Sequence, residues 1–117
     1  MANVTVGESS FLADGGGTGT NLSATCASAP AQSYVMLTNI GSAPTSVTGI
    51  TLFFGDNTVY AALSGCDIGA RGSSDATLYL NFNTGGLNLA FGSSGDPVVV
   101  TINLANGEQI SGTSYFS

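Results

Sequence analysis

Cys26 and Cys66 are the residues of this chain whose side chains can do the best-defined chemistry. They lie too far apart in the sequence for the C-x-x-C spacing of a redox pair. A zinc site needs further thiolate or imidazole ligands, and the chain has no other cysteine and no histidine. We therefore predict one disulfide, Cys26–Cys66, which implies an oxidising compartment or a hyperthermophilic source.

Acidic and amide side chains form the second candidate set, and those expected in loops are Asp56, Asn57, Asp67, Asp75 and Asp96. Oxygen ligands suit calcium, but the sequence has no D-x-D-x-D-G loop. Two carboxylates can also hydrolyse a glycosidic bond, yet nothing in the sequence pairs them. We interpret these residues as turn formers that bond their own backbone, and we predict no metal, no cofactor and no enzymatic activity.

Missing residue types exclude several further classes of function. Without histidine there is no Ser-His-Asp triad, and without lysine there is neither a Schiff base nor a P-loop clamp. Arg71 is the lone cation against seven carboxylates, and the formal net charge is −6. Such a balance argues against nucleic acid and against anionic membranes as partners. No apolar run approaches the roughly 20 residues of a membrane-spanning helix.

Two asparagines stand in the pattern that accepts N-linked glycans. These are Asn3, in Asn3-Val4-Thr5, and Asn21, in Asn21-Leu22-Ser23. Three-residue patterns arise by chance in a chain rich in Asn, Ser and Thr, so an unmodified surface is the alternative. Glycans at these positions would supply solubility that the few charges do not.

Aromatic residues offer a candidate sugar-binding surface, formed by Tyr34, Phe53, Phe54, Tyr60 and Tyr79. Tryptophan, which carbohydrate-binding modules favour for stacking on sugars, is absent. Packing in a hydrophobic core is the alternative for most of the five, and we favour it.

Short runs that alternate between apolar and polar residues, separated by Gly-rich turns, fill most of the chain, and no segment has a helical stripe. We expect strands at residues 2–6, 33–39, 45–54, 57–63, 76–83, 86–91, 97–104 and 108–116. This spacing predicts a single all-β domain over residues 1–117, an Ig-like antiparallel β-sandwich of seven or eight strands.

Two local features should shape these strands. In the run 45–54, Val47 is out of phase with Ile50, and Gly49 stands where a β-bulge would absorb one residue. Asn106-Gly107 tolerates positive φ and predicts a type I′ hairpin turn between the last two strands. Residues 83–86 predict a second hairpin turn.

An N-terminal arm, residues 1–14, precedes a Gly-rich linker at 15–20 and the sandwich at 21–117. The apolar residues of this arm are Val4, Val6, Phe11 and Leu12. The arm has two interpretations: it folds back as the first strand of its own sandwich, or it adds a strand to the sheet edge of a neighbouring subunit. For a β-domain in general we favour the first, and in a filament we favour the second, in which Val4, Val6, Phe11 and Leu12 belong to the inter-subunit strand.

One stretch of the sequence resembles a known family. An apolar strand from Tyr34 ends in Asn39-Ile40-Gly41 and leads into the Thr/Val-rich strand 47–52, and residues 98–107 form a closing hairpin. Over residues 33–116 this pattern resembles the β-sandwich head domain of archaeal type IV pilins and archaellins. The resemblance implies a subunit of an extracellular filament. The chain departs from that family because it lacks the long apolar N-terminal helix of the filament core. Either it is a head domain without its helix, or it belongs to filaments joined by strand donation.

Apolar residues make up 43% of the chain and charged residues 7%, which suits a protein that packs against copies of itself. We expect the structural subunit of an extracellular filament, a pilus or adhesive thread, whose head-to-tail contacts include strand donation by the N-terminal arm. A surface layer or glycans are further candidate partners. The alternatives are a virion surface or capsid protein, a surface-layer-binding pilin-like head, and a carbohydrate-binding module.

Overall fold

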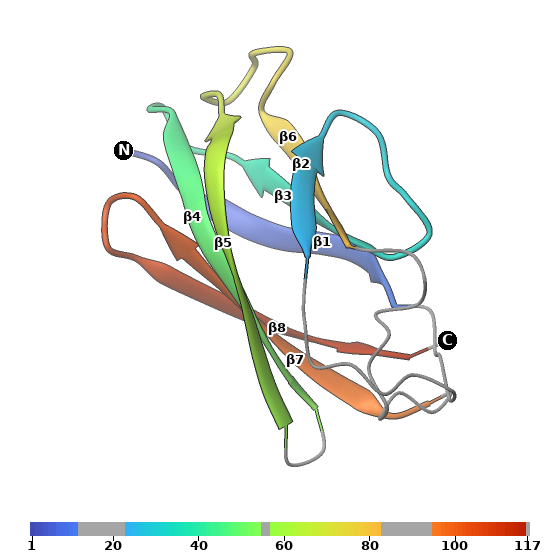
Figure 1. Ribbon diagram of the computed structural model, residues 1–117. Helices are drawn as coiled ribbons and strands as arrows, with labels where there is room; N and C mark the ends of the chain where they lie inside the picture. The colour runs from blue at the N-terminus through green and yellow to red at the C-terminus, as the bar shows by residue number, and fades with distance from the viewer. Residues whose placement is uncertain (12–22, 55–56, 83–94, 117) are drawn as a thin grey trace.

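The alternating runs form eight strands in the computed structural model, which describes residues 1–11, 23–54, 57–82 and 95–116 (Figure 1). The strands are β1 (Val4–Ser10), β2 (Ala24–Ala27), β3 (Tyr34–Asn39), β4 (Thr45–Phe54), β5 (Asn57–Ile68), β6 (Thr77–Phe82), β7 (Pro97–Leu104) and β8 (Gln109–Tyr115). The predicted all-β class and the antiparallel β-sandwich are confirmed, whereas an Ig-like arrangement stays a prediction. In the part of the chain described, no helix is long and apolar enough to span a membrane.

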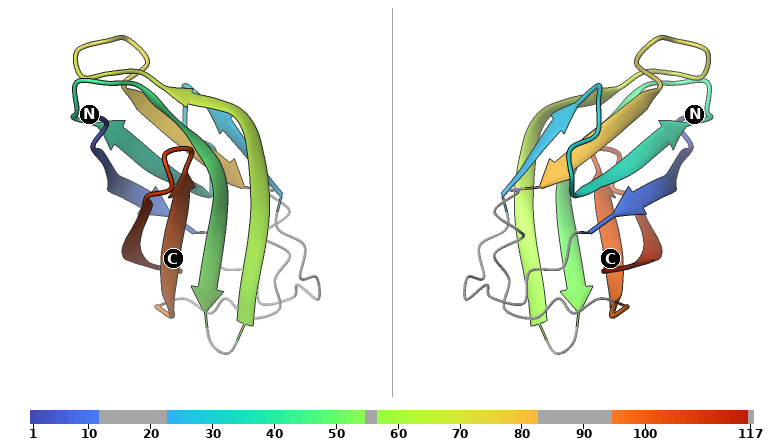
Figure 2. Two further views of the ribbon diagram at one scale, coloured as in Figure 1. Left: turned by 90° about the vertical axis from the view of Figure 1, so that its left-hand side faces the viewer. Right: turned by 90° about the vertical axis from the view of Figure 1, so that its right-hand side faces the viewer.

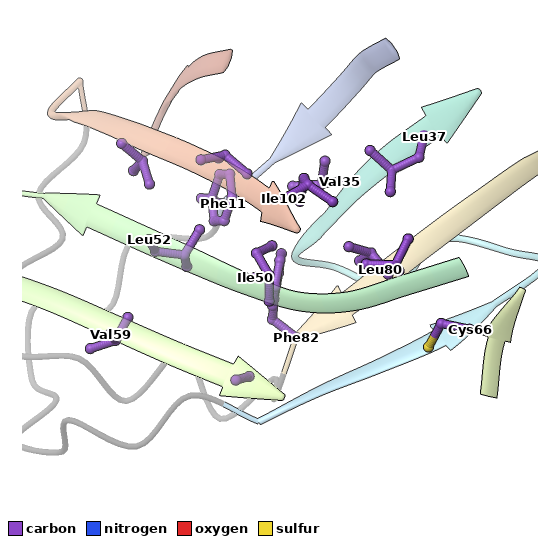
Figure 3. Close-up of a cluster of buried hydrophobic side chains, with 14 of the residues drawn as sticks. Phe11, Val35, Leu37, Ile50, Leu52, Val59, Cys66, Leu80, Phe82 and Ile102 are labelled. Carbon is purple, nitrogen blue, oxygen red and sulfur yellow. The ribbon is translucent and has the colours of Figure 1, made fainter. Parts of the chain in front are cut away.

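Two four-stranded sheets face each other, with strand orders β1-β3-β6-β2 and β5-β4-β7-β8 (Figure 2). Every strand pairing between named strands is antiparallel. Alternate residues point between the sheets, as β7 shows with Val98, Val100, Ile102 and Leu104 buried. Side chains from both sheets meet in one core, where Phe11, Leu80 and Phe82 lie opposite Ile50 and Leu52 (Figure 3). Burial of these side chains is the main stabilising contribution to the fold.

Each open side of the sandwich is linked across the two sheets. On one side β2 faces β5, and the predicted disulfide Cys26–Cys66 is present there. On the other side β1 faces β8, and their ends join through a parallel bridge between Phe11 and Phe116. An edge strand leaves a row of unpaired backbone groups that can pair with another chain. Here the disulfide ties the edge strand β2 to the edge strand β5, and the Phe11–Phe116 bridge ties the ends of the edge strands β1 and β8.

Gly49 lies at a bulge in β4, as the phase change in the sequence predicted. From Val47 to Gly49 the strand advances two residues, while its partner β7 advances one, from Leu104 to Asn103. The extra residue restores the inward direction for Ile50, which is fully buried. The bulge therefore keeps apolar side chains in the core on both sides of the phase change.

The β7–β8 connection differs from the predicted two-residue type I′ turn. The loop is three residues, 105–107, because the Gly107 amide donates to the Leu104 carbonyl (3.0 Å) and the Leu104 amide to the Glu108 carbonyl (2.9 Å). Gly107 follows the turn with a φ of 89°. A three-residue loop that ends in a glycine of positive φ suits the twist of the two flanking strands, as a two-residue type I′ turn does. The dipeptide Asn-Gly is compatible with both kinds of turn.

Two further expectations differ in extent. The short strand β2 was not predicted, because Ala24–Ala27 has no alternation of large apolar residues. β5 runs to Ile68, five residues beyond the expected end at 63. The expected strand 86–91, the turn 83–86 and the linker 15–20 lie outside the described residues.

Removal of the disulfide by Cys26→Ala with Cys66→Ala is expected to lower the free energy of unfolding by about 4 kcal/mol. The reason is that the bridge closes a loop of 40 residues and restricts the unfolded chain. Urea unfolding of the double variant beside the oxidised parent measures the difference. A loss below about 1 kcal/mol would show that the contacts between β2 and β6 hold this side of the sandwich without the bridge.

Candidate assembly site

The N-terminal arm forms β1 and pairs with β3 of its own chain. The register sets Val4 opposite Asn39 and Ser10 opposite Tyr34, with an irregularity between Val6 and Ser9. Within the single chain, the arm therefore supplies the first strand of its own sandwich. Pairing of the arm with the sheet edge of a neighbour stays a prediction.

In the single chain, the apolar side chains of the arm lie in the core of their own chain, and their placement in the core of a neighbour stays a prediction. Val4 is buried, Phe11 is 0% exposed and Val6 is half-buried against the core, while Leu12 lies outside the described residues. The physical reason is that the free edge of β3 and the space beside Phe82 are filled by whichever arm is nearest. In an isolated chain that arm is its own.

Phe11 lies in an aromatic cluster that joins both sheets. Its ring stacks on Phe82 of β6 at 5.4 Å between centroids and meets Phe116 edge-on at 6.2 Å. Phe116 in turn packs edge-on against Phe54 of β4 at 5.7 Å. Aromatic pairs at such distances contribute beyond the area that they bury. Phe11 is therefore the anchor of the arm.

Strands β1 and β8 face each other across the open side of the sandwich, along a line that we call the seam. The seam has one polar contact and, next to it, a hollow. The hydroxyl groups of Ser9 and Ser114 are 2.8 Å apart and share a hydrogen bond. A hollow of about 430 Å³ runs along the seam, and its lining includes Val6, Ile110 and Gly112. Gly112 lies against Val6, so the two strands approach closely there. None of the described residues that line this hollow is charged.

Asn39 fixes the start of the arm from inside the protein. Its side chain is 1% exposed. The Oδ1 atom accepts from the amides of Asn3 (3.0 Å) and Gly41 (2.9 Å). The Nδ2 atom donates to the carbonyls of Ala43 (2.8 Å) and Gly69 (3.0 Å). One amide group thus satisfies four backbone groups from three segments, which explains why this strand ends in asparagine.

Gly41 lets the first three residues cross the β3–β4 turn. A side chain on Gly41 would collide with the backbone of Met1 and Asn3. The Ser42 amide donates to the Met1 carbonyl (3.0 Å), and the Ile40 amide donates to the Asn3 carbonyl (2.9 Å). The Asn39-x-Gly41 pattern is therefore the receptor for the start of the arm, although the sequence signal was read only as a family pattern.

Arg71 borders a second hollow, of about 490 Å³, beside the start of the arm. Residues 1–3, the β3–β4 turn and Glu108 also line it. The Arg71 amide donates to the Gly41 carbonyl (2.8 Å), so its backbone supports the same turn. The lone cation thus lies at the end of the sandwich where the arm begins.

The first glycosylation pattern is accessible and the second is outside the described residues. Asn3 is exposed immediately before β1, and Thr5 is exposed on β1, with its hydroxyl donating to the Thr38 carbonyl (3.4 Å). Asn21 is among the residues not described. Modification of Asn3 and of Asn21 stays a prediction.

The structure separates the five aromatic residues that were considered as one sugar-binding surface. Phe54 is in the core. Phe53 and Tyr60 are exposed on the β5-β4-β7-β8 sheet, whereas Tyr34 and Tyr79 lie on the other sheet with their rings 5.8 Å apart. The five residues therefore form no single surface, and the core packing that we favoured for most of them is wrong, because it holds for Phe54 alone.

Tyr34 of β3 is hydrogen-bonded to Glu8 of β1. The Tyr34 hydroxyl donates to the Glu8 carboxylate at 3.0 Å. This hydrogen bond raises the pKa of Tyr34 above its usual 10.0, and desolvation and the charge of Glu8 act in the same direction. The pair fixes a side chain of β1 to β3 on the outer surface of the sheet.

The acidic candidates do not converge on a site. Asp67 accepts a hydrogen bond from the Ser46 hydroxyl at 2.6 Å, and the Asp75 carbonyl accepts from the Gly69 amide. The Asp96 carbonyl accepts from the Phe116 amide at the β8 end of the molecule. Over residues 1–11, 23–54, 57–82 and 95–116, no three Asp, Glu, Cys or His side chains gather as a metal site would require. Asp56 and the Asn57 side chain lie outside the described residues.

Comparison with known proteins adds no relative: no family model matches the chain, and neither a curated protein nor a solved structure matches it.

The change Asn39→Ala is expected to lower the free energy of unfolding by about 3 kcal/mol, because it leaves several buried backbone groups without a partner. Urea unfolding measures the loss, and amide exchange at Asn3 and Ile40 should accelerate as the start of the arm detaches. Asn106→Ala is the matched control, since exposed Asn106 accepts only from the nearby Glu108 amide in the same turn. Equal losses in the two variants would contradict the role given to Asn39.

The pKa of Tyr34 should fall toward its usual value in Glu8→Gln, because the charged acceptor is removed. A raised pKa in the folded chain favours the neutral phenol, so the stabilising bond is intact below the usual tyrosine pKa and is lost as pH rises through the raised value. Ring-carbon NMR during an alkaline titration follows each tyrosine, with Tyr60 as the internal control. An unchanged Tyr34 titration in Glu8→Gln would rule out this pairing in solution.

Proposed function

We propose that this chain is the repeating structural subunit of an extracellular filament, whose subunits are joined by exchange of their N-terminal arms. The observation that carries the proposal is the position of β1, an edge strand at the start of the chain whose contacts are with β3 and β8. Its anchor, Phe11, fills a place in the core. The arm of another copy can make the same contacts with the same geometry, which makes strand exchange a low-cost route to assembly.

The direction of exchange determines the product. If each arm enters the next subunit and no pair is reciprocal, the contact does not close and a fibre grows. The predicted Gly-rich linker at 15–20 lies outside the described residues, and its composition is of the kind that exchange of arms requires. Val4, Val6 and Phe11 would then occupy in a neighbour the positions that they occupy in their own chain.

The chemistry of the chain supports a position outside the cell. The Cys26–Cys66 disulfide indicates an oxidising environment. Polar contacts at the arm are made by hydroxyl, amide and backbone groups, as in the Ser9–Ser114 and Asn39 contacts. Assembly through such groups requires little desolvation of charge.

The strand order supports an Ig-like outline for the subunit. Six strands follow the order of an Ig sandwich, with β1-β3-β6 as A-B-E and β4-β7-β8 as C-F-G. β5 extends the second sheet beside β4, and β2 takes the edge position beside β6. An Ig-like head would agree with the resemblance to archaeal pilin and archaellin heads.

Ser9→Cys with Ser114→Cys tests arm exchange, because the two hydroxyl groups are in contact across the β1–β8 seam. Chains refolded at high concentration and then oxidised should give a ladder of covalent oligomers on a denaturing, non-reducing gel. Each rung arises when the thiol introduced at position 9 of one arm bonds the thiol introduced at position 114 of the chain that received it.

Each single variant is the matched control, since one added thiol can bridge two chains but no more. It should therefore give no species beyond the dimer. If the double variant runs only as an internally bridged monomer while filaments are present in the same sample, arm exchange is wrong and another contact joins the subunits.

A further inference from the structure

The loop between β7 and β8 holds the one place in the sequence where asparagine is followed by glycine, Asn106-Gly107. Each of the other eight asparagines precedes a residue that has a side chain. Such a side chain hinders the approach of the following backbone nitrogen to the asparagine amide, whereas glycine leaves this approach open. Asn106 is exposed, so water reaches its side chain. The loop therefore combines the residue types and the access that deamidation requires.

Deamidation would be an internal reaction of this dipeptide. The backbone nitrogen of Gly107 gives its proton to a base in solvent and bonds to Cγ of Asn106. The side-chain nitrogen takes up a proton and leaves as ammonia, and a five-membered succinimide ring remains. Water then opens the ring at one of its two carbonyl groups, which gives aspartate or isoaspartate. Water is the only co-reactant consumed, and nothing is oxidised or reduced.

The native turn holds both reacting groups in hydrogen bonds. The Gly107 amide donates to the Leu104 carbonyl at 3.0 Å, and Oδ1 of Asn106 accepts from the Glu108 amide at 2.9 Å. The first bond keeps the proton on the nitrogen that must lose it, and the second fixes the orientation of the asparagine side chain. The Leu104 amide closes the loop by donating to the Glu108 carbonyl at 2.9 Å. Attack on Cγ therefore requires the turn to open first, because reacting atoms must reach a near-attack geometry.

We propose that Asn106 is a deamidation site that the closed β7–β8 turn protects, so that the reaction proceeds through opening of the turn. Local opening at the end of a hairpin costs less free energy than unfolding of the whole domain. The rate is then proportional to the fraction of molecules in which the turn is open. Protection of this kind belongs to the folded chain and does not depend on the proposed filament function.

The two products should affect the fold differently. Aspartate at position 106 keeps the backbone unchanged, and its carboxylate can accept from the Glu108 amide as Asn106 does. Isoaspartate adds one carbon to the backbone of a three-residue loop, so the two hydrogen bonds of Leu104 cannot both form in the observed register. Isoaspartate therefore loosens the start of β8, the strand whose Gly112 lies against Val6 of the arm.

The test follows the full oxidised chain in mildly alkaline buffer, both folded and unfolded in guanidinium chloride. Peptide mass spectrometry locates the modified residue, and chromatography separates aspartate from isoaspartate. The unfolded chain should react at Asn106 more than about tenfold faster than the folded chain, because its turn is always open. Asn106→Ala is the control for the site and should remove this product. The midpoint of thermal unfolding should fall in chains that carry isoaspartate and stay near that of the parent in Asn106→Asp.

Gln109→Ala tests the role of turn opening without changing the reacting residues. Nε2 of Gln109 donates to Oδ1 of Asn103 at 2.8 Å, across the strand pair nearest the loop. Loss of this contact should speed the reaction in the folded chain by about two- to fivefold. Ser111→Ala is the matched control, because it removes the contact with Thr101 two positions farther along the same hairpin. This change should have less effect on the rate.

Three results would each overturn the inference. The first is an unfolded chain that forms no product at Asn106, which would show that the dipeptide is not a modification site. The second is a folded chain that reacts at least as fast as the unfolded chain, which would show that the turn gives no protection. The third is a folded Gln109→Ala chain that reacts no faster than the Ser111→Ala chain, which would show that opening of the turn does not control the rate.

Discussion

The pairing of β1 with the edge of β3 is the interaction on which the rest of this structure depends. Without β1, the β3 edge would be open and the place that Phe11 fills between Phe82 and Phe116 would be empty. Asn39 adds a buried hydrogen-bonding centre that ties the start of the same strand to two loops. A chain with this arrangement must fill the site with an arm, whether its own or that of a neighbour.

Strands with a strong period of two were predictable from the sequence. The run 45–54 and the run 97–104 have the bounds that alternation predicts, and the phase change at Gly49 located the bulge. β2 was missed because four small residues carry no such pattern. The partner of the arm could not be derived either, since an arm in its own sheet and one in a neighbour make the same contacts. Asn39 was visible only as a pattern, because its role needs three segments brought together by the fold.

The scarcity of charge has a consistent physical consequence across the molecule. The contacts that hold the arm are made by rings, hydroxyls, amides and backbone groups. Groups of this kind can be buried between subunits without the desolvation penalty of ions. Exchange of arms would act along the axis of a filament.

Electron microscopy of the chain with and without its arm bridged internally tests the central claim most directly. The Ser9→Cys, Ser114→Cys chain is oxidised as a monomer, and half of the sample is then reduced before both halves are refolded at high concentration. The account predicts filaments from the reduced half and from the parent chain treated in the same way, and none from the bridged half. Filaments of equal length and number from the bridged half would contradict it, because a bridged arm cannot leave its own sheet.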